Sequence, residues 1–289
     1  METNSAPSRF ALAYNPQVDD AAPIVGQITS FLRDKGIKSI FSSNLMDENL
    51  AGRINSAEFD CLIVLGGDGS MLQASHLCAQ AGIPIAGINL GSFGFLVEVQ
   101  RDDWQKYLNQ LLEGKYRREE RMMLRAQLWH GKTLRGSWEV VNEVVVCRGN
   151  LVKPIHLYAS VNGFPMASYV ADGLIAATPT GSTAYALAAG GAIMPPELRN
   201  ILIVPVAPHI SLDRAIILSE GSIVSITVNS SHQAVLSVDG HEPVTVENEE
   251  LVKVETSERN IIFIRFHDPG YFYANLNRYM EKNPSNPPK

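Results

Sequence analysis

Hydrophobic and polar positions follow two alternating patterns over the first third of the chain. Three apolar runs are too short for helices and predict buried strands. Elsewhere apolar residues recur every three or four positions, which predicts amphipathic helices. This succession indicates a parallel sheet covered by helices. The expected strands are residues 10–14, 61–65 and 83–89, and the expected helices are residues 22–35, 70–81 and 104–112.

After residue 121 the pattern changes to short strand-like runs separated by turns with glycine or asparagine. Such runs at this spacing predict an all-β second domain. One more strand and a closing helix are expected at residues 261–266 and 272–281. The runs before them are residues 124–129, 137–147, 155–161, 168–177, 201–205, 216–218, 222–228, 234–238 and 252–256.

Composition narrows the range of partners. The chain has 289 residues, 45% hydrophobic and 19% charged, with a net charge of −6, which is typical of a globular protein. No run of lysine or arginine offers a broad surface for nucleic acid, so no nucleic-acid partner is expected. An anionic substrate then has to be held locally, by backbone N–H groups, helix N-termini, a metal ion or single basic side chains.

Cysteine usage and the lengths of the apolar runs predict a cytoplasmic protein with no membrane partner. Cys61, Cys78 and Cys147 are odd in number and lack metal-ligand spacing, so reduced core thiols are expected. Residues 1–9 contain no apolar signal segment. Apolar runs such as residues 201–204 are far shorter than the roughly 20 residues that a membrane helix needs.

A glycine-rich turn, residues 66–69, follows the strand expected at residues 61–65. Gly-Gly-Asp-Gly opens the next helix, at the place where open α/β sheets bind ligands. The glycines let phosphate oxygens approach the backbone, whereas the Asp68 carboxylate repels them. Asp68 can instead hold Mg²⁺ against the phosphates or accept a proton from an attacking hydroxyl. The structural alternative is a tight turn in which a solvated Asp68 caps the helix.

A second candidate cluster begins at Asp172-Gly173 and continues through residues 178–185. The octapeptide Thr-Pro-Thr-Gly-Ser-Thr-Ala-Tyr precedes a short helix of small residues. Its five hydroxyl groups can bind phosphate, ribose or an amide. A Ser/Thr-rich N-cap is the alternative, although capping one helix needs fewer hydroxyls.

Polar and aromatic residues in unusual places provide further candidates. Asn142 and Glu143 interrupt a β-branched strand, so one of them enters a core unless the strand bulges or ends in a cleft. They can grip an adenine or ribose edge, or lie on a surface edge strand. Phe93 and Phe95, in a glycine-rich loop, can stack on a base or fill the core.

Two common phosphate motifs do not fit the chain. The dinucleotide fingerprint counted from Gly67 would need glycine where Leu72 stands. The sequence at residues 131–133, Gly-Lys-Thr, lacks the leading glycine of a Walker A loop and is better interpreted as a hairpin turn. The seven histidines show no close spacing suited to zinc.

Taken together and in this order, these segments resemble the NAD kinase family over roughly residues 10–270. Gly-Gly-Asp-Gly is shared with diacylglycerol and sphingosine kinases and is weakly specific. The octapeptide of residues 178–185, placed after Asn142-Glu143, is highly specific. The segments that carry the resemblance are residues 66–72, 87–96, 142–143, 172–173, 178–185, 190–191 and 205–209.

The resemblance implies an α/β N-terminal domain with a parallel sheet over residues 1–120 and an all-β, NAD-binding C-terminal domain over residues 121–266. The C-terminal helix returns to the first domain, so residues 267–289 join it. The active site would lie between the domains. Family members are dimers or tetramers, so a homodimer or homotetramer is expected, with part of the pocket supplied by a neighbouring subunit.

The resemblance also implies the reaction. The terminal phosphate of ATP, bound with Mg²⁺ or another divalent metal, would pass to the adenosine-ribose 2′-hydroxyl of NAD and give NADP and ADP. Asp68 would act as the base toward this hydroxyl or as a partner of the metal–phosphate assembly, and no metal ligand is otherwise assigned. Two alternatives are a lipid kinase of the diacylglycerol type, which would need a lipid-sized apolar groove, and a non-catalytic NAD(P)-binding sensor.

The resemblance implies a set of site residues that are expected to contact the nucleotide. They are Gly67, Asp68 and Gly69 at the ribose and phosphates, Phe95 at the adenine, Asn142 and Glu143 at ribose hydroxyls, Asp172 at the nicotinamide end, Thr180, Thr183, Ala184 and Tyr185 around the adenine and its ribose, and Ala207 with Asp239 or His241 completing the pocket. Three positions depart from the usual pattern, so contacts there are expected to differ: Val170 replaces a basic or polar residue, Ala188 replaces serine, and Lys153 stands where arginine is equally usual.

Overall fold

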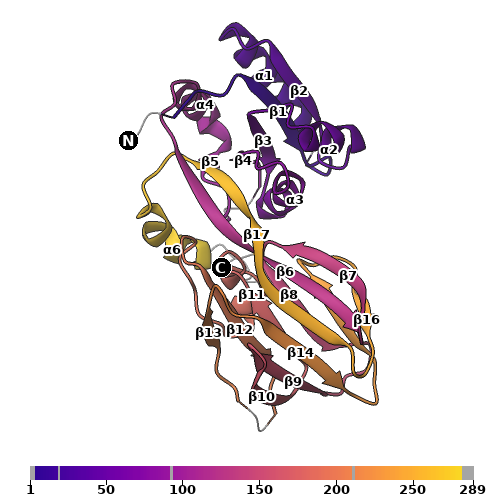
Figure 1. Cartoon of the computed structure of the whole chain (residues 1–289). Helices are drawn as coiled ribbons and strands as arrows, with labels where there is room; N and C mark the ends of the chain where they lie inside the picture. The colour runs from indigo at the N-terminus through magenta and orange to yellow at the C-terminus, as the bar shows by residue number, and fades with distance from the viewer. Residues whose placement is uncertain (1–3, 19, 92–93, 210–211, 282–289) are drawn as a thin grey trace. The chain divides into compact units, whose positions relative to one another are not determined.

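The computed structural model describes residues 4–18, 20–91, 94–209 and 212–281, and the chain divides into two compact units (Figure 1). The first unit comprises residues 1–120 and 261–289, and the second comprises residues 121–260. The chain passes between the units within two long strands, β6 (Arg117–His130) and β17 (Leu251–Arg265). The boundary expected at residue 266 lies just beyond β17, whereas the units divide inside that strand.

A parallel sheet in the order β2–β1–β3–β4 forms the centre of the first unit. Short β5 pairs with β4, and the end of β17 reaches β4 between Phe263 and Ile85. All residues of β3 and β4 are buried, as in a sheet covered on both faces. The strands are β1 (Arg9–Tyr14), β2 (Ser39–Asn44), β3 (Cys61–Gly66), β4 (Ile85–Asn89) and β5 (Val99–Gln100).

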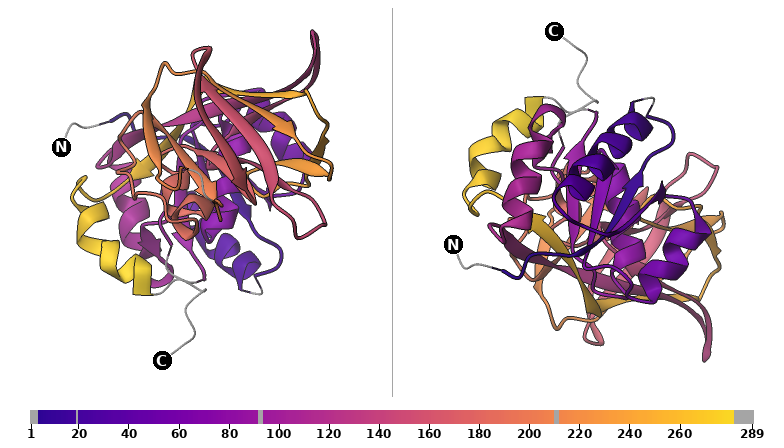
Figure 2. Two further views of the ribbon diagram at one scale, coloured as in Figure 1. Left: turned by 90° about the horizontal axis from the view of Figure 1, so that it is seen from below. Right: turned by 90° about the horizontal axis from the view of Figure 1, so that it is seen from above.

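Helices cover both faces of this sheet (Figures 1 and 2). On one face, apolar residues of α1 (Ala21–Asp34) and α4 (Trp104–Leu112) pack against alternate residues of β1, β3 and β4. On the other face lie α3 (Asp68–Cys78) and, packed against it, α2 (Glu48–Asn55). A one-turn helix, η1 (Arg101–Asp103), precedes α4.

The second unit holds two antiparallel arrays of strands with a hydrophobic core formed by residues of both. One array has the order β10–β9–β14–β17, with β6 also pairing with β17 and carrying β7; the other has the order β13–β12–β11–β8–β15–β16. The strands are β7 (Thr133–Val140), β8 (Glu143–Arg148), β9 (Ile155–Val161), β10 (Phe164–Ala171), β11 (Gly173–Ala177), β12 (Asn200–Val206), β13 (Ile216–Ser219), β14 (Val224–Asn229), β15 (Ala234–Val238) and β16 (Val244–Val246).

Three short or terminal helices complete the fold. A one-turn helix, η2 (Gly181–Thr183), and α5 (Tyr185–Ala188) follow β11, and α6 (Tyr271–Glu281) belongs to the first unit. The predicted fold class, an α/β half with a parallel sheet, an all-β half and a C-terminal helix that rejoins the first half, is confirmed. Among the described residues, no helix combines the length and apolar character needed to cross a membrane.

Two strand predictions were wrong because the chain changes sheets without a change in hydrophobic pattern, and a third error divided one strand into two. The run 137–147 is two strands, β7 and β8, which belong to different sheets and meet at Val141 and Asn142. The run 168–177 is likewise divided at Asp172 into β10 and β11. Conversely, the runs 252–256 and 261–266 are one strand, β17. The elements β2, α2, β5, η1 and β16 were not predicted.

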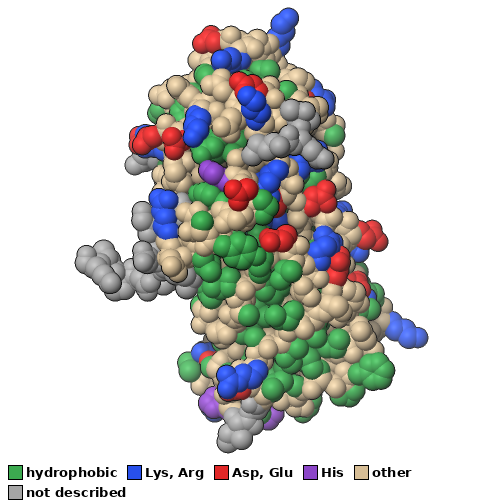
Figure 3. Space-filling view, turned by 90° about the vertical axis from the view of Figure 1, so that its left-hand side faces the viewer, with side chains coloured by type: hydrophobic (Ala, Val, Ile, Leu, Met, Phe, Trp, Pro, Cys, Tyr) green, Lys and Arg blue, Asp and Glu red, His purple; other side chains and the backbone are tan. Residues whose placement is uncertain are grey.

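Large exposed hydrophobic side chains are concentrated in the second unit, and Figure 3 shows hydrophobic groups gathered over the strands of this unit on one face. Within the described part of the chain, all but Met46 and Tyr273 lie between residues 121 and 260. Monomers rarely expose large contiguous apolar patches, so this distribution favours an interaction surface there. These residues are Leu134, Leu151, Val152, Tyr158, Phe164, Tyr185, Leu198, Leu212, Ile217 and Ile223.

Candidate active site

The Gly-Gly-Asp-Gly turn lies at the carboxyl edge of the parallel sheet. Strand β3 ends at Gly66, Gly67 caps the next helix, and Asp68 is the first residue of α3. Gly66 is required here because a Cβ atom at this position would collide with the Ser70 hydroxyl. Gly67 is half-buried and Gly69 is exposed, so the backbone of the turn can be approached from solvent.

The carboxylate of Asp68 is held by the backbone of the loop that follows β4. Its Oδ2 accepts a hydrogen bond from the N–H of Phe95 at 2.7 Å, and its Oδ1 accepts one from the N–H of Leu96 at 2.9 Å. Gly94 leaves room for this contact, since a Cβ there would overlap the carboxylate. Asp68 therefore does not act as the N-cap of α3. Its carboxylate is oriented by the peptide N–H groups of Phe95 and Leu96.

Phe95 packs within the first unit rather than standing free in its loop. Its ring centroid lies 4.2 Å from that of Tyr279 and 6.4 Å from that of Phe272, both on α6. Phe95 remains half-buried despite these contacts. Phe93, the other aromatic of the predicted pair, lies outside the described residues.

In the second unit, Asp239 organises the Asn142-Glu143 segment. Its two carboxylate oxygens accept hydrogen bonds from three consecutive backbone N–H groups, those of Val141 at 2.7 Å, Asn142 at 2.8 Å and Glu143 at 2.9 Å. Asp239 is buried and has a positive φ of 49°, a conformation uncommon outside glycine. These bonds satisfy the peptide groups where the chain passes from β7 into β8.

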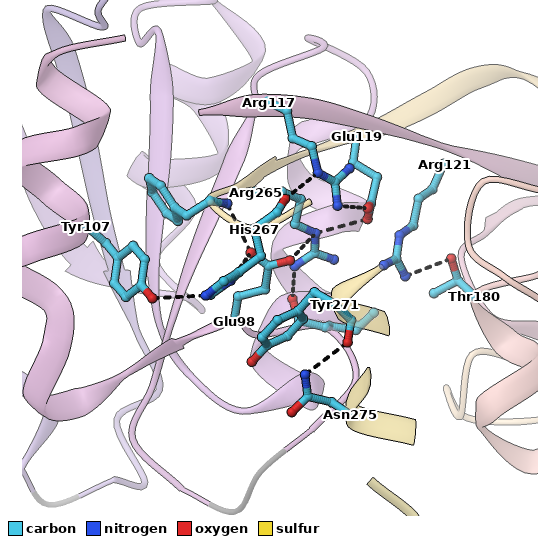
Figure 4. Close-up of polar contacts among 12 residues, drawn as sticks. Glu98, Tyr107, Arg117, Glu119, Arg121, Thr180, Arg265, His267, Tyr271 and Asn275 are labelled. Atoms are coloured by element: carbon cyan, nitrogen blue, oxygen red, sulfur yellow. Dashed lines mark hydrogen bonds and ion pairs between the residues drawn. The ribbon is translucent and has the colours of Figure 1, made fainter. Parts of the chain in front are cut away.

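Most hydroxyl groups of the turn at residues 178–185 form hydrogen bonds that hold the turn itself together. Thr178 Oγ1 donates to the Val141 carbonyl at 2.6 Å and accepts from the Gly181 N–H at 3.0 Å. The Ser182 hydroxyl donates to the Pro179 carbonyl at 2.7 Å. The same Ser182 hydroxyl accepts from the Met194 N–H at 2.9 Å, and the Thr183 hydroxyl donates to the Thr180 carbonyl at 3.0 Å. Arg121 donates to the Thr180 hydroxyl at 3.4 Å (Figure 4).

This turn also rests directly on the Asn142 backbone. Thr178 N–H donates to the Asn142 carbonyl at 2.9 Å, and a Cβ at Gly181 would collide with the same carbonyl. The two predicted clusters, Asn142-Glu143 and residues 178–185, are therefore adjacent. Of the five hydroxyls, that of Tyr185 stands apart, because the side chain is 45% exposed and leaves the turn.

Glu143 is a buried carboxyl with one oxygen left without a partner. The residue is 7% exposed, the backbone N–H of Tyr185 bonds to it, and its Oε2 has no hydrogen-bond partner within the described chain. Burial, followed by the nearby charge of Asp239, raises the pKa of Glu143 to about 8, against the lowering effect of the Tyr185 N–H. At neutral pH the carboxyl is largely protonated, so it can both donate a hydrogen bond to a hydroxyl and accept one.

Asp172 and Ala207 lie next to one end of the central strands of this sheet, and Glu143 lies at the other end. The strand register puts Gly173 beside Cys147 and Val206, and Ala177 beside Glu143, roughly 13 Å further along the strand. Asp172 pairs with Arg148 at 3.0 Å. Ala207 is exposed with a positive φ of 45°.

Tyr185 is close enough to Asp172 and to Glu143, at the two ends of these strands, for both charges to affect its pKa. Burial, then the neighbouring Cys147 and Asp172, raises its pKa, and Glu143 adds a smaller effect in the same direction. The tyrosine therefore lies near both the Asp172 end and the Glu143 end of these strands.

The remaining predicted site residues are at or near the surface. Lys153 lies in the loop between β8 and β9, and Ala188 is exposed on α5. Ala184 is half-buried beside Tyr185. His241 lies two residues after Asp239, and its Nδ1 lies 3.0 Å from the Val238 carbonyl.

Two family models match this chain, one in each half of the sequence. Residues 141–266 match the family model of the ATP-NAD kinase C-terminal domain, and residues 48–116 match that of the ATP-NAD kinase N-terminal domain. A protein from Chloroflexus aurantiacus named NAD kinase is 34% identical over 271 residues, which cover 93% of this chain and 96% of that protein. The chain belongs to the NAD kinase family. Another NAD kinase, from Dehalococcoides mccartyi, is 31% identical over 95% of this chain and 96% of its own length.

The fold of this chain is also similar to the folds of solved NAD kinase and NADH kinase structures. Yeast NADH kinase complexed with NADH superposes with a TM-score of 0.83 at 22% identity, covering 98% of this chain and 90% of that one. An NAD kinase from Archaeoglobus fulgidus in complex with ATP superposes with a TM-score of 0.74 at 23% identity, covering 95% of this chain and all of that one. The predicted resemblance to the NAD kinase family is confirmed.

One histidine–carboxylate cluster lies away from these NAD kinase motifs. His130, Glu247 and Glu250 present ligand atoms within 4.8 Å of one another, a proximity that sequence spacing did not reveal. The buried Glu250 carboxylate, however, already binds Arg135 through both oxygens at 2.7 and 2.9 Å and the Glu247 N–H at 2.9 Å. A cation would have to displace this arginine, so we interpret the cluster as an ion pair at the β6–β7 hairpin.

The raised pKa of Glu143 predicts a pH-dependent stability. Below the ordinary glutamate pKa the carboxyl is protonated in both the folded and the unfolded chain. As pH rises toward 8 the unfolded chain releases this proton first, so the free energy of unfolding falls. Glu143→Gln should therefore be more stable than wild type at pH 9, on the order of a few kcal/mol, and about equal at pH 4.

Urea unfolding of both proteins at pH 4, 7 and 9 measures this difference. Glu220→Gln is the matched control, because the hydrogen bond from Arg199 lowers the pKa of Glu220 and its loss should destabilise the protein at neutral and high pH. A Glu143→Gln protein that is less stable than wild type at pH 9 would contradict the assigned ionisation.

Sequence reasoning missed two sets of residues that shape the site. It named Asp239 as a pocket residue but not as the acceptor for three backbone N–H groups. It also gave no place to Arg265, Glu98 and Glu119, whose ion pairs lie in the first unit (Figure 4). A charged residue inside an apolar strand, as Arg265 is within β17, is the signal that could have revealed them.

Proposed function

We propose that this chain transfers the terminal phosphate of ATP to the adenosine-ribose 2′-hydroxyl of NAD, giving NADP and ADP. Its membership of the NAD kinase family supports the choice of substrates. The single observation that carries the chemistry is the half-buried carboxylate of Asp68, oriented by the N–H groups of Phe95 and Leu96 at the N-terminus of α3. A fixed carboxylate beside an exposed glycine turn suits proton transfer next to a phosphate.

In the proposed reaction, Asp68 accepts the proton of the 2′-hydroxyl as that oxygen attacks the γ-phosphorus of ATP. The bond between the γ-phosphorus and its bridging oxygen breaks, and ADP leaves with that oxygen. A ribose hydroxyl is a poor nucleophile at neutral pH, so a carboxylate within hydrogen-bond reach assists. Positioning and charge neutralisation supply most of the rest in phosphoryl transfer.

A divalent metal such as Mg²⁺, brought by ATP, would neutralise the charge on the transferring phosphate. The Asp68 carboxylate supplies hard oxygen donors of the kind that Mg²⁺ prefers, and two backbone N–H groups fix its orientation. Apart from Asp68 we assign no protein ligand to this metal. Asp68 can therefore serve the metal, the hydroxyl, or both in turn.

For NAD binding, we assign the second-unit cluster. Asn142 and the protonated Glu143 suit ribose hydroxyls, because together they offer hydrogen-bond donors and acceptors. Tyr185 suits the adenine and its ribose, and Asp172 the nicotinamide end. The expected roles of Gly67, Gly69, Phe95, Lys153, Thr180, Thr183, Ala184, Ala188, Ala207 and His241 are part of the same proposal.

The decisive experiment incubates pure protein with NAD, ATP and Mg²⁺ and detects NADP with an NADP-specific dehydrogenase. NADP that depends on all three additions is the expected result. NAD binding without NADP would favour the sensor alternative, and phosphorylation of diacylglycerol in place of NAD would favour the lipid kinase. Either outcome would overturn the proposed function.

We also propose a homodimer or homotetramer and a cytoplasmic location. The exposed apolar side chains of the second unit support self-association (Figure 3). Three free cysteines, two of them fully buried, are compatible with a reducing compartment.

A further inference from the structure

Four charged side chains of the first unit form a continuous series of ion pairs (Figure 4). Arg117 Nη2 lies 2.9 Å from Glu119 Oε2, and Glu119 Oε1 accepts from Arg265 Nε at 3.0 Å. Arg265 Nε also lies 3.8 Å from Glu98 Oε1. The side chains of Arg265, Glu98 and Glu119 are 4%, 8% and 9% exposed, so these charges are nearly withdrawn from water.

Arg265 makes one more contact, and it leads to Asp68. Its Nη1 donates to the Leu96 carbonyl at 2.7 Å. The N–H of the same Leu96 donates to Asp68 Oδ1 at 2.9 Å, and the preceding N–H, of Phe95, donates to Oδ2 at 2.7 Å. The Leu96 carbonyl therefore binds Arg265, and the Leu96 N–H group binds the Asp68 carboxylate. The guanidinium and the Asp68 carboxylate are joined through a single residue.

Other contacts from the C-terminal part of the chain hold the same loop. Glu98 Oε2 accepts from the Phe266 N–H at 3.0 Å and lies 3.3 Å from His267 Nδ1. The Tyr279 ring of α6 packs on Phe95. Residues 95–98 are thus attached to the segment that follows β17 by side-chain and backbone bonds, whereas they have few ladder hydrogen bonds of their own, since β5 begins only at Val99.

A buried ion pair is weak evidence for stability, because desolvation of the two charges offsets their attraction. Arginine has a planar fork of donors that can satisfy a carboxylate and a carbonyl at fixed angles, which lysine cannot reproduce. The geometry at Arg265 uses this property, since Nε faces the carboxylates and Nη1 faces Leu96.

We propose that Arg265 is a positioning residue for Asp68: by fixing the Leu96 carbonyl it sets the direction of the two N–H groups that orient the reactive carboxylate. This inference rests on the proposed function, because it assigns Asp68 to the phosphoryl-transfer step. Displacement of the carboxylate then lowers turnover, while the residues proposed to bind NAD in the second unit are untouched.

The test compares Arg265→Lys with Arg117→Lys in steady-state kinetics. Arg265→Lys keeps the charge but loses the Leu96 contact, and a displacement of about 1 Å should lower kcat roughly 10- to 100-fold. KM for NAD should stay within about threefold of wild type, because ground-state binding is unchanged. Arg117→Lys disturbs the same ion series, through Glu119 and the His267 carbonyl, without touching residues 94–96, so it should lower Tm yet leave kcat within about twofold.

A double-mutant cycle separates positioning from general stabilisation. In an Asp68→Asn background, Arg265→Lys should lower kcat by less than about twofold, since there is no carboxylate left to orient. Equal losses in both backgrounds, or a full kcat in Arg265→Lys while wild type forms NADP, would overturn the inference.

A readout independent of turnover keeps this test distinct from that of the proposed function. Amide resonances of Phe95 and Leu96 should shift in Arg265→Lys and stay in place in Arg117→Lys, because only the first loses the bond to the Leu96 carbonyl. If wild type makes no NADP, the proposed function fails, and the amide shifts still decide whether Arg265 orients these groups. Unchanged Phe95 and Leu96 resonances in Arg265→Lys would overturn the positioning role.

Discussion

Replacing Asp68 with asparagine is expected to lower kcat roughly 10²- to 10⁴-fold, the usual loss when a general base is removed. The amide cannot take the proton of the 2′-hydroxyl. It also turns an NH₂ group toward one of the two N–H donors, of Phe95 or Leu96, that now bond to the carboxylate. Initial rates of NADP formation measure the loss, and calorimetry measures NAD affinity separately.

Asp60→Asn is the matched control for this experiment. Asp60 precedes the opposite end of β3, and its Oδ2 likewise accepts two backbone N–H bonds, from Ser8 and Arg9, each at 3.0 Å. The same chemical change at Asp60 should reduce stability but leave kcat unaltered. Full turnover in Asp68→Asn would remove both the base role and the metal role of this residue.

Asp239→Ala is expected to be the most destabilising of the substitutions considered in the second unit. It leaves the N–H groups of Val141, Asn142 and Glu143 without their acceptor, and the bonds to Val141 and Glu143 are buried. At about 1–3 kcal/mol for each buried unsatisfied donor, the free energy of unfolding should fall by roughly 2–5 kcal/mol. Because these N–H groups fix Asn142 and Glu143, NAD affinity should fall as well.

A graded series makes this prediction specific. Asp239→Asn keeps an acceptor oxygen for two of the three N–H groups and should lose less stability than Asp239→Ala. Asp213→Ala removes an exposed carboxylate in the same unit and should change stability by no more than about 0.5 kcal/mol. Urea unfolding of the three variants gives the order of their free energies of unfolding. Equal losses of stability in Asp239→Ala and Asp239→Asn would contradict a stabilising role for the three backbone hydrogen bonds to Asp239.

Local patterns in the sequence were sufficient for most of the first unit. The runs at residues 10–14 and 61–65 became β1 and β3 almost without change, since strands buried on both faces must be apolar throughout. The edge strand β2, Ser39–Asn44, escaped notice because its residues are half-buried or exposed and carry three serines. The position of Asp68 at the start of a helix followed from the strand, the glycines and the helical spacing alone.

The second unit shows where local patterns stop being informative. Residues 137–147 and 168–177 are apolar on both sides of Asn142 and Asp172, yet at those residues the chain leaves one sheet for another. Hydrophobic periodicity reports that a residue is buried, but it does not report which neighbours bury it. The hydroxyls of residues 178–183 illustrate the same limit, since three of them bond to nearby backbone carbonyls.

The sequence by itself determined the fold class, the order of the two halves, the family, and the residues from which a nucleotide site is built, because glycine turns, strand lengths and motif order are local properties. Only the tertiary structure decided how those residues are held. Asp239 accepts hydrogen bonds from Asn142 and Glu143, the Tyr279 ring packs on Phe95, and Arg265 binds the Leu96 carbonyl next to Asp68. These contacts join residues far apart in the chain, and polar pairing over such separations has no periodic signature. It depends on which side chains packing brings within hydrogen-bond distance.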